Sequence, residues 1–187
     1  MKSIYRRHVH EVLDSQLPNT FSGYVMRPIK LSKLERKAAT LFPGSRLYSR
    51  AVPKGTLFLH LIPHRRQERL QAEVGWSVTD RFPIELSSQG PISKPANELL
   101  EPEWMIDFGE IYHRRYKLGF LGWDLWKCSV DAEDPNFVRI FMKEDLVLVT
   151  EDQARERAES AVAACLKDLK DVAIPYLDEW IKSRRPA

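Results

Sequence analysis

The chain has 187 residues, of which 43% are hydrophobic, and it carries 29 basic and 26 acidic side chains. This length suffices for one sizeable core, and a net charge of +3 is too balanced to indicate nucleic-acid binding by charge alone. No run approaches the roughly 20 apolar residues of a membrane span, and residues 4–17 lack the apolar core of a signal peptide. We therefore expect one domain, residues 1–187, in a reducing cytoplasm, with Cys128 and Cys165 as free buried thiols.

The N-terminal third predicts a helix, a short helix and a strand, in that order. Residues 3–17 have helical spacing, with Ser3 as a cap and Pro18 as the end. A capping box at residues 32–35 predicts a short helix, and residues 46–52 have the composition of a strand. The apolar stripe of the first helix consists of Tyr5, Val9, Val12, Leu13 and Leu17.

The clearest pattern is a pair of strands within residues 56–78. The first is apolar on both faces, which indicates a central strand, whereas the second alternates and indicates one buried face. His60 lies on an apolar face of the first strand, so we interpret it as a hydrogen-bonded core residue. Ser77 lies on the polar face of the second strand and lacks the closing glycine of a nucleophile elbow, so we expect it to face solvent.

The middle of the chain predicts a loop and a further strand. Residues 81–102 contain four prolines and indicate a long loop of the kind that often carries function. Residues 104–108 alternate, which predicts a strand that runs toward Tyr112. Continued alternation would place Asp107 and Glu110 on opposite faces, so they would not form one catalytic site.

The C-terminal part predicts the most regular helix. Residues 150–153 form a capping box, and helical spacing continues to Val172 with Cys165 on the buried stripe. Pro175 is expected to break or kink this helix before a final apolar face. The pattern as a whole predicts an α+β fold, a central mainly antiparallel β-sheet flanked by N-terminal and C-terminal α-helices.

Three short clusters combine histidine with arginine, at residues 6–8, 64–66 and 113–115. The planar guanidinium suits carboxylates and phosphates, so clusters that converge on one face would bind an acidic protein surface or a phosphate backbone. Separate clusters would simply be solvated turns and helix faces. The candidate partner-binding residues are His64, Arg65, Arg66, His113, Arg114 and Arg115.

The sequence contains no complete catalytic, nucleotide-binding or metal-binding motif. His10 and Asp14 stand four residues apart but lack a third ligand, and neither zinc-binding pattern, Cys-x-x-Cys or His-Glu-x-x-His, occurs. We therefore expect no catalytic residue, no metal and no cofactor. A small-molecule enzyme with a pocket around His60 is the weaker alternative.

Four segments, residues 57–61, 73–77, 104–109 and 172–177, together resemble small uncharacterised bacterial α+β proteins. Some of those resemble immunity proteins encoded beside antibacterial toxins. The resemblance implies a non-enzymatic protein that neutralises a cognate toxin by covering its active site, and it transfers no catalytic residue. A nucleic-acid-binding or processing protein that uses the Arg/His clusters is the alternative, and the oligomeric state stays open.

Overall fold

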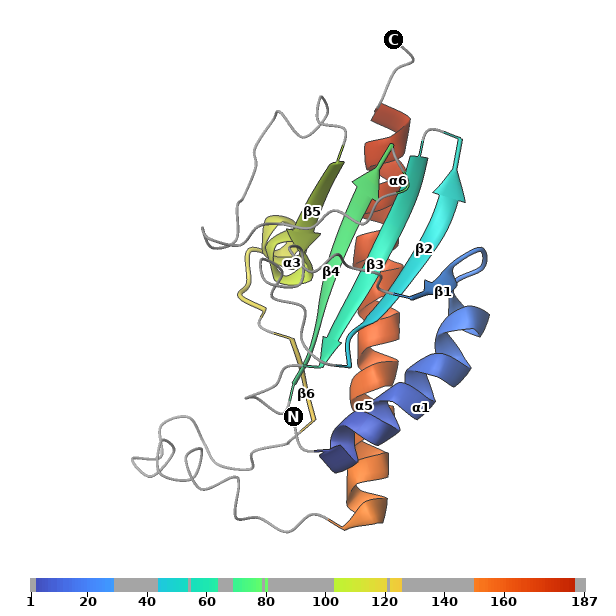
Figure 1. Cartoon of the computed structure of the whole chain (residues 1–187). Coiled ribbons are helices and arrows are strands. Elements are labelled where there is room, and N and C mark those ends of the chain that lie inside the picture. Colours follow the sequence, from blue (N-terminus) through green and yellow to red (C-terminus); the bar gives the residue numbers. More distant parts are fainter. Residues whose placement is uncertain are drawn as a thin grey trace, which may run out of the picture.

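An antiparallel sheet with helices packed along one face forms the frame of the molecule (Figure 1). The strand order is β1-β2-β3-β4-β5, β6 pairs with β4, and every pairing is antiparallel. This arrangement confirms the predicted α+β fold. The computed structural model describes residues 3–28, 44–53, 55–63, 69–78, 80, 103–120, 122–125 and 150–183.

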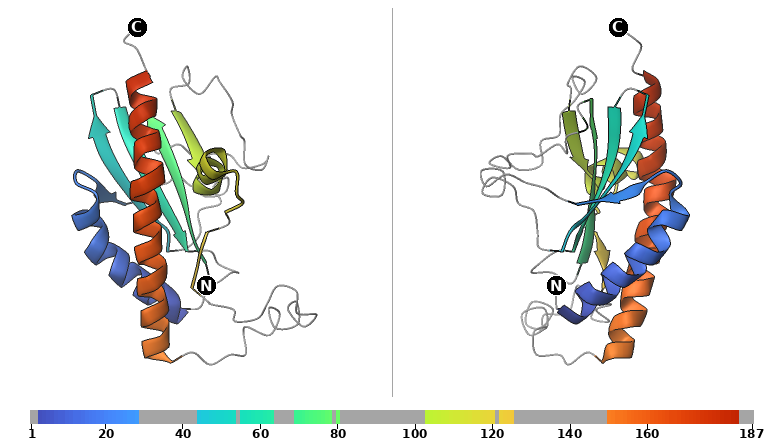
Figure 2. Two further views of the ribbon diagram at one scale, coloured as in Figure 1. Left: turned by 180° about the vertical axis from the view of Figure 1, so that it is seen from behind. Right: turned by 45° about the vertical axis from the view of Figure 1, so that its right-hand side comes forward.

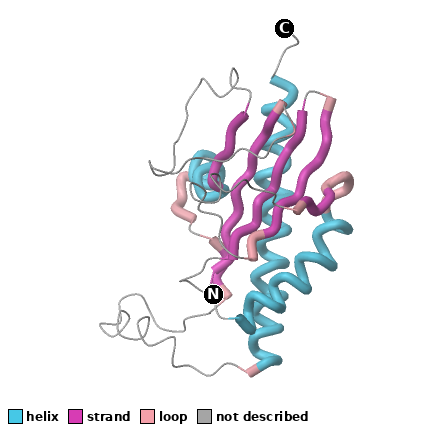
Figure 3. The backbone as a smooth tube through the Cα atoms, in the orientation of Figure 1, coloured by secondary structure: helices cyan, strands magenta, loops and turns pink. Residues whose placement is uncertain are grey.

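The elements follow one another along the chain as a helix, a set of strands, a short helix and a long C-terminal rod (Figure 3). Their bounds are α1 (Ser3–Thr20), β1 (Val25–Arg27), β2 (Arg46–Val52), β3 (Gly55–Pro63), β4 (Arg69–Ser77), β5 (Glu103–Asp107), α3 (Phe108–Tyr116), β6 (Trp123–Asp124), α5 (Glu151–Asp168), the π-helical turn η3 (Leu169–Ala173) and α6 (Ile174–Ser183).

The central strand β3 is buried on both faces, as its composition predicts. Leu57, Leu59 and Leu61 belong to the core cluster that α1 and α5 share with the sheet, and Phe58 and Ile62 are buried on the opposite face. Strands β2 and β4 pair with β3 along almost its whole length. Full pairing satisfies the backbone polar groups of a strand that has no contact with water.

Helix α1 and the α5–η3–α6 rod cover the same face of the sheet (Figure 2). The predicted stripe of α1 is buried throughout, which confirms its amphipathic pattern. The predicted end at Pro18 is wrong by two residues, and side chains of the last turn add hydrogen bonds to the carbonyls of the preceding turn. Asn19 Nδ2 donates to Ser15 O, and Thr20 Oγ1 donates to Gln16 O.

Ser77 does not face solvent, which corrects the prediction for this residue. It is fully buried at the end of β4, opposite Thr56 in the register. Gly55 approaches so closely here that a Cβ on it would lie 2.3 Å from Ser77 O, and its φ of 146° also favours glycine. The close approach of the two strand ends accompanies the burial of Ser77.

The strand predicted to run toward Tyr112 ends instead at Asp107. The Asp107 carboxylate accepts the Gly109 N–H at 2.7 Å and thereby caps α3, which begins at Phe108. Glu110 therefore lies in the first turn of a helix, and its negative charge acts on Asp107. The expectation that strand alternation separates Asp107 from Glu110 is wrong.

The C-terminal helix begins where the sequence predicts and does not end at Pro175. Thr150 Oγ1 accepts the Gln153 N–H at 3.2 Å, and the Gln153 side chain accepts the Thr150 N–H, which confirms the capping box. The helix then widens in η3 and continues as α6 (Figure 2). Cys165 is a free thiol on its buried face, as expected, and burial raises its pKa.

Several predictions fall on residues that the structure does not describe. They concern the short helix at residues 32–35, the loop at residues 81–102 and the thiol of Cys128. Within the described residues, none of the helices combines the length and apolar character needed to cross a bilayer.

The replacement Leu59→Ala tests the burial of β3 on the face that packs against the helices. Leu59 is fully buried between Tyr48 and Val74 in the register, so the cavity should lower the free energy of unfolding by about 3 kcal/mol. Urea denaturation measures the loss. Val78→Ala is the control, because Val78 is 48% exposed and its truncation should change stability by less than about 0.5 kcal/mol. Equal losses would contradict the central placement of β3.

Candidate functional site

The predicted site that the structure describes is the C-terminal end of α3. Lys117 ends the helix in the left-handed conformation, at φ 60°, and its N–H donates to His113 O at 2.8 Å. His113, Arg114 and Arg115 form the last turn, where the negative end of the helix dipole favours cations. These three consecutive residues therefore lie at the C-terminal end of α3.

Aromatic packing fixes α3 against the rest of the fold. Phe108 is buried, and its ring centroid lies 5.1 Å from those of Phe120 and Trp123. Tyr112 stacks on Phe120 at 4.9 Å. Gly109 must be small, since a Cβ there would lie 2.5 Å from Phe120 O. Tight packing on this side leaves the opposite side of α3 to solvent.

The three predicted residues have different surroundings. His113 is exposed. Arg114 is half-buried and pairs with Glu110 at 3.2 Å, so part of its charge is balanced within the helix. Arg115 is exposed, donates from Nη1 to Asp171 O at 2.6 Å, and lies over the Tyr116 ring at 5.4 Å from its centroid.

We use the name α3 surface for His113, Arg115, Tyr116, Lys117 and Leu118, all of which are exposed. Tyr116 and Leu118, which are 43% and 60% exposed, are apolar groups among cations. Lys167 of α5 lies close enough to Tyr116 to interact with it electrostatically, and it extends the positive charge. A hydrogen bond from Lys167 to Asp171 raises the pKa of that lysine. The sequence shows Tyr116 next to residues 113–115, whereas the exposure of Tyr116 and Leu118 is shown only by the fold.

The other two Arg/His clusters do not join this surface within the described residues. His64, Arg65 and Arg66 lie outside the part of the chain that the structure describes. Arg7 and His8 contact Glu151 at the start of α5, whereas Arg115 contacts Asp171 beyond its end. At 1.5 Å per residue these two points of the rod are about 30 Å apart. Residues 6–8 and 113–115 therefore lie apart, which is one of the two arrangements that the sequence left open.

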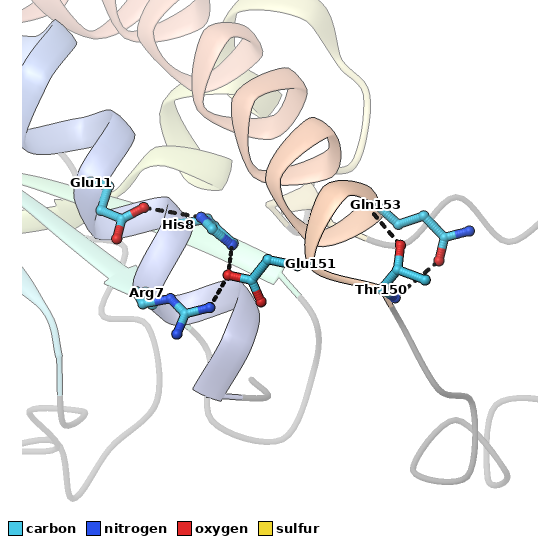
Figure 4. Close-up of polar contacts among 6 residues, drawn as sticks. All are labelled: Arg7, His8, Glu11, Thr150, Glu151 and Gln153. Atoms are coloured by element: carbon cyan, nitrogen blue, oxygen red, sulfur yellow. Dashed lines mark hydrogen bonds and ion pairs between the residues drawn. The ribbon is translucent and has the colours of Figure 1, made fainter.

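His8 joins α1 to the start of α5 in a buried contact (Figure 4). Its Nδ1 lies 3.0 Å from Glu11 Oε2, and its Nε2 lies 2.9 Å from Glu151 Oε1. Arg7 also pairs with Glu151. Because a carboxylate only accepts, an imidazole protonated on both nitrogens can donate to both partners. This arrangement holds two helices together and is a structural clasp.

A second polar group crosses three strands on the sheet face away from the helices. His60 Nδ1 lies 2.9 Å from Glu73 Oε2, which confirms that His60 is a hydrogen-bonded core residue. Glu73 stands opposite Asp107 in the register. Burial raises the pKa of Asp107, the Glu73 charge raises it further, and the Gly109 N–H opposes the shift. Asp107 is therefore protonated more readily than a free aspartate.

His10 and Asp14, which have the spacing but not the number of ligands for a metal site, both have contacts within the protein. Asp14 accepts two hydrogen bonds from Arg46, each at 3.1 Å, and one from Tyr48 at 3.3 Å. His10 Nε2 lies 2.6 Å from Gly44 O. Among the residues that the structure describes, no group of three His, Cys, Asp or Glu side chains could hold a metal ion.

A scan against protein-family models and searches of curated proteins and of solved structures find no match to this chain. Function therefore has to be argued from the surfaces described above.

The replacement His8→Ala tests the clasp. It removes a buried side chain and both carboxylate contacts, so we expect a loss of about 2 to 4 kcal/mol in the free energy of unfolding. Glu159→Ala is the control, because Glu159 is exposed on α5 outside this contact and its truncation should change stability by less than about 0.5 kcal/mol. Denaturant titration of both variants gives the comparison. A His8→Ala loss no larger than the control would rule out the clasp.

The replacement Asp107→Asn tests whether the buried Asp107 carboxylate lowers the stability of the fold. Because the folded-state pKa of Asp107 is raised, the ionised carboxylate opposes folding above that pKa, and protonation removes this cost as the pH falls. Asparagine still accepts the Gly109 N–H, so Asp107→Asn should be at least as stable as the natural chain at pH 7. The difference in stability between Asp107→Asn and the natural chain should shrink as the pH falls and Asp107 becomes protonated. Thermal melts from pH 3 to 7 measure this difference. A difference that grows as the pH falls would contradict the prediction.

Proposed function

We propose that this protein is a non-enzymatic binding protein that docks an acidic protein partner on the α3 surface. An immunity protein that covers the active site of its cognate toxin would act in this way. The observation that carries the proposal is the combination of exposed Tyr116 and Leu118 with Arg115, Lys117 and His113.

The composition of the α3 surface suits a protein interface. Tyrosine and arginine dominate the binding energy of such interfaces, usually near their centre. Tyr116 and Leu118 offer apolar area that a partner would remove from water, at about 25 cal/mol per Å². Arg115 is already held by Asp171 O and the Tyr116 ring, so less side-chain freedom is lost on binding.

The charge balance favours a protein over a nucleic acid. Arg114 is paired with Glu110, and Lys167 with Asp171, so acidic groups lie within and beside the cationic patch. A phosphate backbone would be repelled by these carboxylates and would gain little from Leu118. An acidic protein with its own apolar centre matches both features. The acidic metal site of a nuclease toxin is one surface of this kind, and cations would complement its charge.

Isothermal titration against the product of the adjacent gene tests the proposal, with Tyr116→Ala as the diagnostic variant. Loss of a central aromatic residue should weaken binding about thirtyfold, equivalent to about 2 kcal/mol. Lys182→Ala is the control, because Lys182 is exposed on α6 and lies outside the α3 surface. Equal affinities for both variants would contradict docking at α3.

A gel-shift series over salt concentration distinguishes protein binding from the alternative, which is nucleic-acid binding. Nucleic-acid binding with affinity that falls steeply with salt, together with no heat against any neighbouring gene product, would replace the protein-binding proposal. Binding to the neighbouring product with no gel shift would support it.

A further inference from the structure

The outer side of the α5–η3–α6 rod is a helix face that none of the described helices and strands covers. In the rear view of Figure 2 the rod lies in front of the sheet, with α1 beside it. Exposed residues follow one another along this side at spacings of three and four, which keep them on one face of a helix. We call Glu156, Glu159, Ala163, Lys167 and Lys170 the α5 stripe.

The charges of the α5 stripe change sign at Ala163. Glu159 and Lys167 lie four residues before and after Ala163, and Glu156 and Lys170 lie seven residues before and after it. Arg155 is also exposed, but it lies about 80° away from Ala163 around the helix axis, on the flank of the helix. The stripe is therefore acidic in its first half and basic in its second half.

The helix dipole does not account for this pattern. The dipole favours acidic residues in the first turn and cations in the last turn, and its effect falls off within one turn. Glu156 and Glu159 lie beyond the first turn of α5. The two lysines lie in the middle of a rod that continues through η3 and α6 to Ser183.

Contacts within the chain leave most of these charges available to a partner. Within the part of the chain that the structure describes, Glu156, Glu159 and Lys170 take part in no ion pair or side-chain hydrogen bond. Lys167 pairs with Asp171 at 3.1 Å, and its side chain is 75% exposed. An ammonium has three donors, so Lys167 can bind a second carboxylate as well.

We propose that two copies of this protein pair through their α5 stripes, antiparallel to each other, across a two-fold axis at Ala163. Glu159 of one copy then stands level with Lys167 of the other, and Glu156 with Lys170, and the symmetry makes each pair occur twice. The small side chain of Ala163 allows the two helices to approach closely. A parallel arrangement would place like charges level with one another, so the charges also select the direction.

The pairing should be weak and sensitive to salt. Exposed ion pairs contribute little individually, and salt screens them, so the dimer should form at high protein concentration and low ionic strength. This inference goes beyond the proposed function, because it concerns another surface and needs no other protein. Only Lys167 of the stripe lies close to the α3 surface.

Sedimentation equilibrium of the full chain tests the pairing, at protein concentrations from about 10 µM to about 1 mM. We expect a reversible dimer at about 50 mM sodium chloride, and its dissociation constant should rise at least about tenfold at about 500 mM. A chain that stays monomeric over this whole range would overturn the proposal. A dimer whose dissociation constant does not depend on salt would overturn it too.

An exchange of charges tests the antiparallel register. Glu156→Lys and Lys170→Glu should each weaken the dimer at least about tenfold, because each places like charges level with one another. The chain that carries both replacements regains opposite charges, so its dissociation constant should return to within about threefold of the natural value. Both residues are exposed, so neither replacement should disturb the fold.

Glu179→Lys is the matched control, because it makes the same change in net charge on α6, at an exposed position that has no counterpart in the α5 of the other copy. It should leave the dissociation constant unchanged. Equal weakening by Glu156→Lys and by this control would overturn the proposal, as would a double variant that does not regain the dimer.

Ala163→Arg gives a second test that does not depend on charge pairs in the natural chain. A long side chain at the two-fold axis should keep the helices apart and abolish the dimer, while circular dichroism should show an intact fold because Ala163 is exposed. A dimer as stable as that of the natural chain would show that Ala163 does not lie in the interface and would overturn the proposal.

Discussion

The fold depends on the burial of β3 on both of its faces. Leucines on one face pack against the helices, and Phe58, His60 and Ile62 are buried on the other. A strand without access to water requires neighbours that satisfy its backbone, and β2 and β4 provide them in register. It also requires a partner for its one titratable side chain, which Glu73 supplies at 2.9 Å.

The helices that cover this strand are fastened to one another and to the sheet by polar contacts. Arg157 Nη1 donates to Tyr5 OH at 2.8 Å, and His8 contacts Glu151, so α1 is tied to α5 at two points. In the middle of the rod, Arg115 ties α3 to η3. The α3 surface is thus connected to the core by Asp107, by aromatic packing and by Asp171. A surface held at three points would lose less conformational freedom in the binding that we propose.

Patterns carried by consecutive residues were sufficient for much of the fold. The stripe of α1, the capping box at Thr150 and the alternation of β4 over residues 69–74 are confirmed, since each depends on neighbours in the sequence. Helix α3 was missed because Trp104, Ile106 and Phe108 continue the alternation of β5 into its first residue. The spacing of Asp107 and Glu110 was a local signal for a helix start, and the stronger hydrophobic pattern outweighed it.

For the candidate site, the sequence by itself determined that His113, Arg114 and Arg115 stand together. The tertiary structure decided that His113 is exposed, that Arg114 pairs with Glu110 and that Arg115 binds Asp171 O. It also placed residues 6–8 at a different part of the fold. It also decided that Pro175 is absorbed in a π-helical turn. The physical reason is that helix starts and strand faces are set by residues a few positions apart. Exposure and the partner of a backbone carbonyl depend instead on segments that meet only after folding, as Arg115 and Asp171 do.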